Sequence, residues 1–401
     1  MKKVKGMRDI LPEEMIARER VFQIISETYR EFGYVPLETP ALEMMKTLTA
    51  KSGAEIAGQI FRVEEELGLR FEFTVSLARV AAQTTFPKPF KRYQMGPVWR
   101  KEEPQKGRFR EFWQADADIV GCPSMRADAE LLEVANTALN RLGFEKPRIT
   151  LSNRKILNDV FEKLGIKKPE EAMRILDKLD KLEKKEVERQ LEAAFKGKGK
   201  KLLGLLSEEG DNDEKLEGME KYSPEGVKEV REIMECFPNF ELDLTLARGL
   251  AYYTGPVYEF REKGLGSSIA GGGRYDTMLK IFGKDEPAAG ISLGVERIMM
   301  LLPKKEKKAT YTKVFVASFP ETYKYALQLA KDFRGEGIPA ETDLMGRSLR
   351  KQFDYANAES IPYIAIAGKK EMEQKKLTLR NMKSGEEELL TFIEAAERAG
   401  A

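Results

Sequence analysis

Apolar residues recur at two spacings along the first part of the chain, and each spacing predicts a kind of element. Helical spacing over residues 15–29 and again over residues 127–142 predicts two amphipathic helices. Apolar and polar positions alternate over residues 90–99 and 111–121, which predicts two strands. The long charged loop RKEEPQKGRFR joins these strands, so we expect a hairpin that can hold a ligand over its tip.

The middle of the chain changes from strand-like to helical sequence and back. Strands are expected within residues 58–77, at FRVEE and GLRFEFT, and at residues 149–152. From residue 155 to about residue 234 the pattern is helical and dense in Lys and Glu, with breaks at FKGKGKKLLG and EEGDNDEKLEG. Strand-like sequence resumes at FELDLTLARGLAYYTG, PVYEFRE and SSIAGGGRYD, and AAGISLGVERIMMLL then turns into a helix. The pattern therefore predicts a helical module inserted into a strand-rich domain.

The last part of the chain has an alternation of its own. The charged run at residues 304–308 is poor in apolar residues and is expected to be a linker. Beyond it, KVFVAS, IPAETDL, PYIAIAG and KLTLRNM predict strands, and helices are expected over residues 321–334, over residues 348–357 and at the C-terminus. This βαβαββ order, followed by a helix, predicts a small α/β domain within a chain of the α+β class.

Composition removes several kinds of chemistry. The 401 residues include no histidine, which excludes Ser-His-Asp triads, Cys-His pairs and histidine-ligated zinc. The two cysteines, Cys122 and Cys236, cannot close a four-ligand zinc site, so no zinc is expected. Their spacing demands no disulfide, and a reduced chain is expected. The 68 Lys and Arg against 66 Asp and Glu give a net charge of +2, so nucleic acid would have to bind at local patches.

The chain shows no pattern that is typical of membrane proteins or of exported ones. No window approaches the roughly 18–20 apolar residues that a membrane span needs. Lys2 and Lys3 are basic, but no apolar stretch of signal-peptide length follows them. We therefore expect a soluble, cytoplasmic protein without a membrane partner.

Two arginine-containing segments are candidates for binding phosphate. The first is the charged loop between the aromatic residues Trp99 and Phe112, whose candidate residues are Arg100, Glu102, Lys106, Arg108 and Arg110. Guanidinium groups bind phosphate oxygens at two points, and an aromatic ring beside them can stack on a purine. The second is GISLGVERIMM, where Arg297 opens a helix after a strand. A solvated charged loop and an ordinary surface arginine are the alternatives.

Two glycine-containing segments are candidates for lining a pocket. Three successive glycines in AGGGRYD let the backbone approach a ligand or another strand closely, although the segment fits neither of the common phosphate-binding loops. ARGLAYYTG carries Arg248 and the adjacent Tyr252 and Tyr253. On a strand, one of these tyrosines would line a pocket while the other packs. Tight packing without a ligand and a strand with two core tyrosines are the alternatives.

In chain order, these segments resemble class II aminoacyl-tRNA synthetases and, within that class, the histidyl-tRNA synthetase family in its archaeal form. FGYVPLETPALE resembles motif 1, with its proline at Pro40, RYQMGPVWRKEEPQKGRFREFWQ resembles motif 2, and GISLGVERIMMLL resembles motif 3. RGLAYYTG and GGGRYD resemble the two histidine signatures of the family. The resemblance begins at Gly6 and covers nearly the whole chain.

The resemblance implies an architecture. It implies a class II antiparallel sheet core with flanking helices, a helical insertion and a C-terminal α/β anticodon-binding domain. The catalytic core would occupy residues 1–152 and 241–304, the insertion residues 153–240, and the anticodon-binding domain residues 312–401. Motif 1 of this class builds a two-fold dimer, so a homodimer is expected.

The resemblance also implies a role for each candidate residue. Arg100 would grip the α-phosphate of ATP, Arg297 the γ-phosphate, and Arg248 the α-phosphate while the adenylate forms. Glu102 would face the adenine, and Phe112 would stack on it. The residues implied to bind histidine are Glu72, Thr74, Arg108, Gln114, Asp118, Arg248, Tyr252, Tyr253 and Tyr275. The alternation in QADADIV places Gln114, Asp116 and Asp118 on one face of a strand.

The implied reaction is the activation of L-histidine by ATP with Mg²⁺, followed by transfer to the 3′ end of tRNA(His). One alternative is a non-catalytic regulatory subunit of ATP phosphoribosyltransferase, although such relatives usually lack the C-terminal domain. Another is a class II synthetase for a different amino acid. The chain departs from the family pattern at Ala251, where many members have Asp, and at Trp113 and Ala115, which flank Gln114. These departures predict a pocket of altered shape.

Overall fold

The computed structural model describes the whole chain except residues 1, 51–53, 106, 248–251, 303–309 and 401. Two compact units are present, the first made of residues 1–9 and 20–302 and the second of residues 10–19 and 303–401. None of the helices in the described part of the chain combines the length and the apolar character that a membrane span needs.

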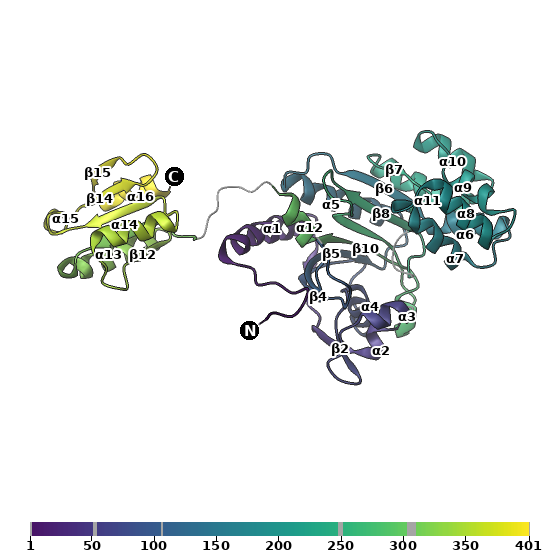
Figure 1. The fold of residues 1–401 in the computed structure, drawn as a ribbon, viewed down its shortest axis with the longest axis horizontal. Coiled ribbons are helices and arrows are strands. Elements are labelled where there is room, and N and C mark those ends of the chain that lie inside the picture. Colours follow the sequence, from purple (N-terminus) through teal and green to yellow (C-terminus); the bar gives the residue numbers. More distant parts are fainter. Residues whose placement is uncertain (1, 51–53, 106, 248–251, 303–309, 401) are drawn as a thin grey trace. The chain divides into compact units, whose positions relative to one another are not determined.

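An eight-stranded sheet forms the centre of the first unit (Figure 1), with the order β1-β4-β5-β10-β9-β8-β6-β7. In that order the strands are β1 Val35–Pro36, β4 Phe90–Trp99, β5 Glu111–Val120, β10 Ala288–Gly294, β9 Ala270–Arg274, β8 Pro256–Arg261, β6 Arg148–Asn153 and β7 Glu241–Leu242. Neighbours from β4 to β6 run antiparallel, whereas the short edge strands β1 and β7 pair in parallel. The predicted antiparallel sheet core is therefore confirmed.

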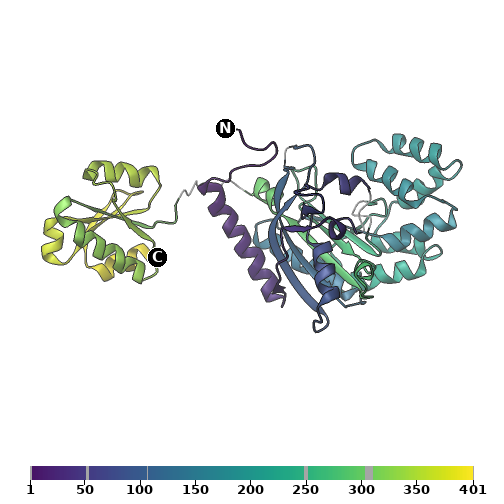
Figure 2. The ribbon, with the colours of Figure 1, turned by 90° about the horizontal axis from the view of Figure 1, so that it is seen from below.

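The two faces of the sheet are covered by different helices, as the alternation along β5 requires. Ala115, Ala117 and Ile119 join the core formed with α1 Pro12–Glu31 and α5 Arg126–Arg141, and the hydroxyl of Tyr29 on α1 donates to the carbonyl of Ala115 at 2.9 Å. Figure 2 shows α1, in purple, along one side of the sheet. Val120 packs on the opposite face, in a smaller core with α4 Thr74–Gln83 and the short helix η2 Leu279–Phe282. Side chains at even positions of β5 therefore face away from α1.

Helices fill the chain between β6 and β7, as the Lys- and Glu-rich pattern predicts. They are α6 Arg154–Lys163, α7 Pro169–Leu176, η1 Asp177–Asp180, α8 Lys184–Ala194, α9 Gly199–Leu206, α10 Asn212–Glu220 and α11 Pro224–Cys236. The side chain of Asn153 begins this run, because it accepts a hydrogen bond from the backbone N–H of Lys155 at 2.8 Å and so caps α6. The apolar faces of the helices are continuous with the core that covers the α1 side of the sheet.

The region of residues 58–77 is the first place where the expected strands are wrong. Of GLRFEFT, only Gly68 and Leu69 lie in a strand, β3 Leu67–Leu69, which pairs with β2 Leu42–Met44, and FRVEE contributes an isolated bridge at Arg62. Glu72 instead accepts hydrogen bonds from the backbone N–H groups of Thr74 and Val75, at 2.5 and 2.9 Å, and thereby caps the start of α4. The short helices α2 Met45–Leu48 and α3 Ala54–Gln59 lie between β2 and β3 in the chain.

The second mistaken strand is the one expected around Tyr252 and Tyr253. The described residues 252–255 form a turn, and β8 starts only at Pro256. The backbone N–H of Thr254 donates to the carbonyl of Arg274 at 2.8 Å, which holds the turn against the end of β9.

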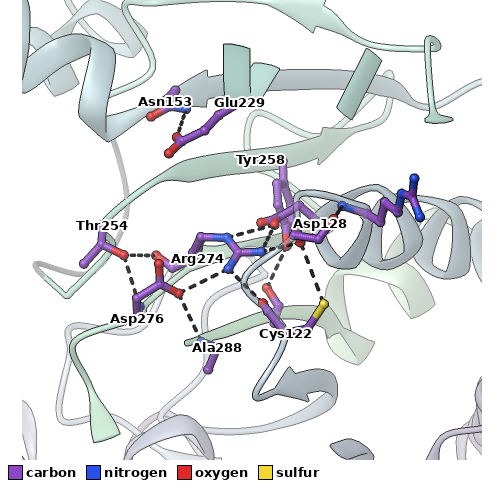
Figure 3. A network of polar contacts seen from close by, with 12 residues as sticks. Cys122, Asp128, Asn153, Glu229, Thr254, Tyr258, Arg274, Asp276 and Ala288 are labelled. Carbon is purple, nitrogen blue, oxygen red and sulfur yellow. Dashed lines mark hydrogen bonds and ion pairs between the residues drawn. The ribbon is translucent and has the colours of Figure 1, made fainter. Parts of the chain in front are cut away.

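A buried ion pair ties β9 to α5 on the α1 side of the sheet (Figure 3). The guanidinium of Arg274, which is 2% exposed, bonds through Nε to the carboxylate of Asp128 at 3.0 Å and through Nη2 to the carbonyl of Ser124 at 2.9 Å. It also contacts the carboxylate of Asp276 at 3.3 Å, which in turn accepts from the backbone N–H of Ala288 at 3.1 Å. The arginine of GGGRYD is therefore part of the framework that holds β9, β10 and α5 together.

The second unit contains a five-stranded sheet with the order β12-β11-β13-β14-β15. Its elements are β11 Val314–Ser318, η3 Pro320–Thr322, α13 Tyr323–Gly335, β12 Ala340–Thr342, α14 Leu349–Ala358, β13 Tyr363–Ala367, α15 Lys369–Gln374, β14 Leu377–Asn381, β15 Glu387–Leu390 and α16 Phe392–Gly400. Helices α13 and α16 cover one face and α14 covers the other. The expected α/β alternation is present. The additional β15 and α15 lack the buried apolar residues that would have revealed them.

The Arg274–Asp128 pair generates a stability prediction. Replacing Asp128 with Ala leaves a buried guanidinium without its main counter-ion, which should lower the free energy of unfolding by about 3–5 kcal/mol. Urea denaturation followed by circular dichroism measures the loss. The matched control is Glu241→Ala, because the Arg148–Glu241 pair is 60% and 48% exposed and its loss should cost about 1 kcal/mol or less. Equal losses in the two variants would contradict a structural role for the buried pair.

Candidate functional site

A pocket of about 180 Å³ lies between the hairpin of β4 and β5, strand β9, strand β10 and the start of α12 Val295–Leu301. Six of the predicted site residues line it together: Arg100, Glu102, Arg108, Phe112, Gln114 and Arg297. They come from three separate elements, so the fold gathers side chains that lie far apart in the sequence. We call this space the outer pocket.

Two arginines of the outer pocket, Arg100 and Arg297, donate to backbone carbonyls. Nε of Arg100 donates to the carbonyl of Phe71 at 3.3 Å, and its guanidinium lies 4.3 Å from the ring centroid of Phe71 and 5.0 Å from that of Phe112. Burial lowers the pKa of Arg100 from its usual value, and the nearby carboxylates of Glu102 and Glu72 oppose that shift. Nη1 of Arg297 donates to the carbonyl of Ser268 at 2.7 Å. Both guanidinium groups are thus oriented before any ligand arrives.

The loop between β4 and β5 is fixed by its own charges. The carboxylate of Glu102 forms an ion pair with Arg108, and its carbonyl accepts from Nε of Arg110 at 2.8 Å. The loop turns at Gly107, whose φ of +75° is a conformation that side chains rarely adopt. The predicted hairpin with a polar tip is therefore present, and its tip forms one wall of the outer pocket.

Glycines on β9 and β10 leave room for the side chains of the site. Gly271 lines the outer pocket next to Ser292 in the register of β9 and β10. A Cβ on Gly273 would come within 2.8 Å of the ring of Tyr253, and a Cβ on Gly290 would overlap the carboxylate of Asp118. Close packing is therefore confirmed, also at Gly272, which packs against the ring of Tyr258 on the other face, whereas a close approach of the backbone to a ligand stays a prediction.

A buried polar group adjoins the outer pocket on the same face of β5. Nε2 of Gln114 donates to the hydroxyl of Ser292 at 2.6 Å, and the Ser292 side chain is in turn hydrogen-bonded to Asp116. Two residues further along β5, the carboxylate of Asp118 lies 2.8 Å from Nη2 of Arg92 and accepts from the hydroxyl of Tyr275 at 2.5 Å. Burial raises the pKa of Asp118, and it raises that of Asp116 to about 8 with the help of the neighbouring Asp118 charge.

The remaining predicted residues close this group from the α4 side. The side chain of Thr74 is hydrogen-bonded to Tyr252, whose ring centroid lies 5.0 Å from that of Tyr253 and 5.8 Å from that of Tyr275. Burial raises the pKa of Glu72, whose carboxylate caps α4. We call Glu72, Thr74, Arg92, Asp116, Asp118, Tyr252, Tyr253 and Tyr275 together the inner polar group.

The structure therefore brings together every predicted site residue except Arg248, which lies outside the described residues, as does Ala251. Trp113 and Ala115 take odd positions on β5 and face α1, where Trp113 stacks on Phe22 at 4.6 Å between centroids. The altered pocket shape that these two residues predicted does not follow from their positions.

Sequence reasoning missed several members of the site. Ser292 and Glu296 had no signal of their own, because only the register of β10 places them beside Gln114 and Trp113. Arg92 looked like an ordinary strand residue, yet it is fully buried against Asp118. Asp116 was placed on the right face by alternation but was given no role.

The described residues contain no cluster of three acidic or cysteine side chains that could hold a metal ion, and Cys122 and Cys236 are both free thiols. Glu102 and Glu296 are the carboxylates that line the outer pocket, and the backbone N–H of Trp113 donates to Glu296 at 2.8 Å.

Comparison with known proteins gives a family for each part of the chain. The family model described as histidyl-tRNA synthetase matches residues 6–298, and one described as an anticodon binding domain matches residues 301–399. A histidine–tRNA ligase of Korarchaeum cryptofilum is 41% identical over 94% of this chain and 93% of its own length.

Solved structures agree in fold. The crystal structure of histidyl-tRNA synthetase from Nostoc sp. PCC 7120 superposes with a TM-score of 0.88 at 29% identity and covers 100% of this chain and 99% of its own. A Bacillus halodurans structure, titled an ATP phosphoribosyltransferase regulatory subunit/histidyl-tRNA synthetase, has a TM-score of 0.78 at 21% identity over 92% of this chain and 98% of its own, and it shows the fold alone. With a family model that spans most of its length and a relative at 41% identity, this chain belongs to the histidyl-tRNA synthetase family.

Proposed function

We propose that the chain is a histidine–tRNA ligase of class II that activates L-histidine with ATP and transfers it to the 3′ end of tRNA(His). The observation that carries this proposal is that a pocket lined by arginines adjoins a group of buried polar side chains. The outer pocket offers two preoriented guanidinium groups, of Arg100 and Arg297, and the adjoining inner polar group is rich in buried carboxylates. Such a site suits the phosphates of a nucleotide beside a nitrogenous side chain.

The activation step needs like charges to meet. A carboxylate oxygen of histidine attacks the α-phosphorus of ATP, a new O–P bond forms, and the bond to the β-phosphate oxygen breaks as pyrophosphate leaves. Arg100 neutralises the α-phosphate and Arg297 the γ-phosphate, and preoriented donors of this kind stabilise the charge that builds up in the transition state. The family resemblance adds Arg248 at the α-phosphate. No general base is required, which suits a chain without histidine.

ATP binding uses the rest of the outer pocket. The ring of Phe112 stacks on the adenine, and Glu102 faces its amino group. Mg²⁺ would enter with ATP as part of the substrate, and Glu102 and Glu296, which line the outer pocket, are the carboxylates that would hold it there. Arg108, which forms an ion pair with Glu102, would turn toward the phosphate or the substrate carboxylate.

Histidine binding uses the inner polar group. Glu72, Thr74 and Gln114 hold the α-amino group, and Asp118 faces the imidazole ring together with Tyr253, Tyr252 and Tyr275. A pocket built from buried hydrogen-bonding groups rejects apolar amino acids of similar size strongly, because such ligands leave those groups unpaired.

The second unit reads the anticodon in this proposal, and residues 153–240 form an insertion in the catalytic unit. Exposed basic residues of the second unit would meet the tRNA backbone: Arg350, Lys351, Lys369 and Lys370. Arg347 lies beside them, with Nε 2.6 Å from the carboxylate of Asp343. Unstacked anticodon bases are recognised through stacking and their polar edges.

The enzyme is proposed to be a cytoplasmic homodimer. Exposed apolar side chains gather in or beside the segment that resembles motif 1: Val35, Leu42, Met44 and Val63. Apolar residues that are exposed close together are typical of surfaces that a partner covers.

The activity itself is tested by ATP–pyrophosphate exchange with each amino acid, and histidine alone should support it. In the variant Arg100→Ala, histidine-dependent exchange should fall about 10²- to 10³-fold, because one preoriented donor to the α-phosphate is lost. An unchanged circular dichroism spectrum controls for folding. Exchange at near wild-type rate would refute the role of Arg100, and a wild-type chain that exchanges with no amino acid would favour the regulatory alternative.

A chain that ends at Leu302 separates activation from tRNA recognition. It keeps every residue proposed to bind ATP and histidine, so it should retain histidine-dependent exchange. Aminoacylation of tRNA(His) should fall strongly because the contacts to the anticodon are gone. Charging as efficient as that of the full chain, with the same discrimination between anticodons, would show that the second unit does not read the anticodon.

Sedimentation velocity tests the assembly. The full chain should sediment with a mass of about twice 45.6 kDa. Replacing Leu42 and Met44 with Glu should shift it toward the monomer, whereas Leu344→Glu, at a more exposed apolar residue of the second unit, should not. A wild-type monomer at micromolar concentration would rule out the dimer.

A further inference from the structure

Asp116 is a buried carboxylate that the proposed reaction does not use. It lies on β5 between Gln114 and Asp118 and is 4% exposed. The side chain of Ser292 is hydrogen-bonded to it, whereas its Oδ1 atom has no hydrogen-bond partner among the residues that the structure describes. A buried acceptor without a donor is costly, so its presence needs an explanation such as a bound ligand.

Asp118 is in a different state. Its carboxylate accepts from the hydroxyl of Tyr275 at 2.5 Å and forms an ion pair with Nη2 of Arg92 at 2.8 Å. A positive and a negative charge therefore compensate each other there, although Oδ2 of Asp118 takes part in the ion pair without a hydrogen bond. The neighbouring Asp116 forms no ion pair with the residues that the structure describes, so it has the greater capacity to accept a hydrogen bond from a ligand.

The position of Asp116 fits a ligand that enters through the outer pocket. Gln114 and Ser292, which line that pocket, are hydrogen-bonded to each other, and Asp116 is the next residue on the same face of β5. Among the described residues, the charged and titratable groups that act on it are Arg92 from β4, Asp118 from β5, Glu72 before α4, Tyr252 and Tyr253 from the turn, and Tyr29 from α1. Two of these described groups are carboxylates and one is a guanidinium, and such surroundings favour a ligand that can carry a proton.

We propose that Asp116 is a specificity-determining residue that accepts a hydrogen bond from a ring N–H of the histidine substrate and shares one proton with the imidazole. The inference rests on the proposed function and deepens it. In the complex, one proton lies between the two groups, either as carboxylic acid with imidazole or as carboxylate with imidazolium. An apolar side chain of similar size could not take part in this exchange.

The proposal has a definite dependence on pH. Burial raises the pKa of Asp116 to about 8, so the free enzyme supplies the shared proton at neutral pH, while free imidazole titrates near 6.5. Between these values no proton is gained or lost on binding. Above about pH 8 both partners are deprotonated before they meet, so histidine binding should weaken as pH rises further. Below about pH 6.5 one proton must leave, and binding should weaken again.

Pyrophosphate exchange by the full chain, measured from pH 5.5 to 9.5, tests the proposal. In Asp116→Asn, which keeps the shape of the side chain, the KM for histidine should rise about 10- to 100-fold, the range for losing a hydrogen bond to a charged group. The KM for ATP should stay within about twofold. The decline of kcat/KM for histidine that begins near pH 8 should also disappear. The α-amino group of histidine titrates alike with both enzymes, so the difference between the two profiles isolates Asp116.

A second variant keeps the test valid if Asp116→Asn folds poorly. Ser292→Ala leaves the carboxylate in place but removes a hydrogen bond that favours its charged form. It should move the alkaline decline to higher pH without abolishing it. An unchanged KM for histidine in Asp116→Asn, or an unmoved decline in both variants, would overturn the proposal. A wild-type enzyme without histidine-dependent exchange would instead overturn the proposed function, and this inference with it.

Discussion

No side chain fits at Gly272, Gly273 or Gly290 on strands β9 and β10, because the backbone of β10 fills the space at Gly272 and other groups fill it at the remaining two glycines. The space above Gly273 is taken by the ring of Tyr253, and the space above Gly290 by the carboxylate of Asp118. The site is therefore sunk into the sheet, and its polar groups are shielded from water by the strands themselves. Glycine within a strand costs roughly 0.5–1 kcal/mol relative to alanine, and the large continuous core on the α1 side of the sheet is what makes this cost tolerable.

Three arginines near these strands have different partners. The partners indicate whether an arginine holds the fold together or can bind a ligand. Arg274 is neutralised by Asp128 and several carbonyls, and it fastens β9 to α5. Arg92 is neutralised by Asp118 deep in the inner polar group. Arg100 instead donates to a carbonyl and lies beside two aromatic rings, which orient its guanidinium, while the carboxylates of Glu102 and Glu72 act on it from nearby. A guanidinium oriented in this way can form strong charge-assisted hydrogen bonds with a phosphate.

The inner polar group and the outer pocket are linked through one pair of side chains. Gln114 reaches the outer pocket, and Ser292 is hydrogen-bonded to both Gln114 and the buried Asp116. In the proposed reaction the nucleotide lies on one side of this pair and the amino-acid side chain on the other. Through this pair, the position of the reacting carboxylate of histidine depends on whether its imidazole ring is bound correctly. An enzyme that activates one amino acid selectively needs this dependence.

Much of this protein was readable from local pattern alone. The hairpin of β4 and β5, helix α5 and the helical run between β6 and β7 follow from apolar spacing, and the order of short motifs identified the family and most of the site. The sequence pattern failed where tertiary contacts outweighed local preference. GLRFEFT does not continue as a strand, because the carboxylate of Glu72 binds the backbone N–H groups at the start of α4. Tyr252 and Tyr253 lie outside the sheet, in a turn that is held by the hydrogen bond from Thr254 to the end of β9.

The sequence also could not predict which partner each buried charged side chain has. Alternation placed Asp116 and Asp118 on one face of β5, but only the pairing of β5 with β4 and β10 decides that Arg92 neutralises Asp118 while Ser292 is hydrogen-bonded to Asp116. A carboxylate looks the same in a sequence whether it is paired or not, because its charge state depends on which strands lie beside it. The sequence by itself indicated most side chains of the site, although not Arg92, Ser292 or Glu296, and the tertiary structure decided how each of them is partnered, since burial and cross-strand partners arise only when distant strands pair.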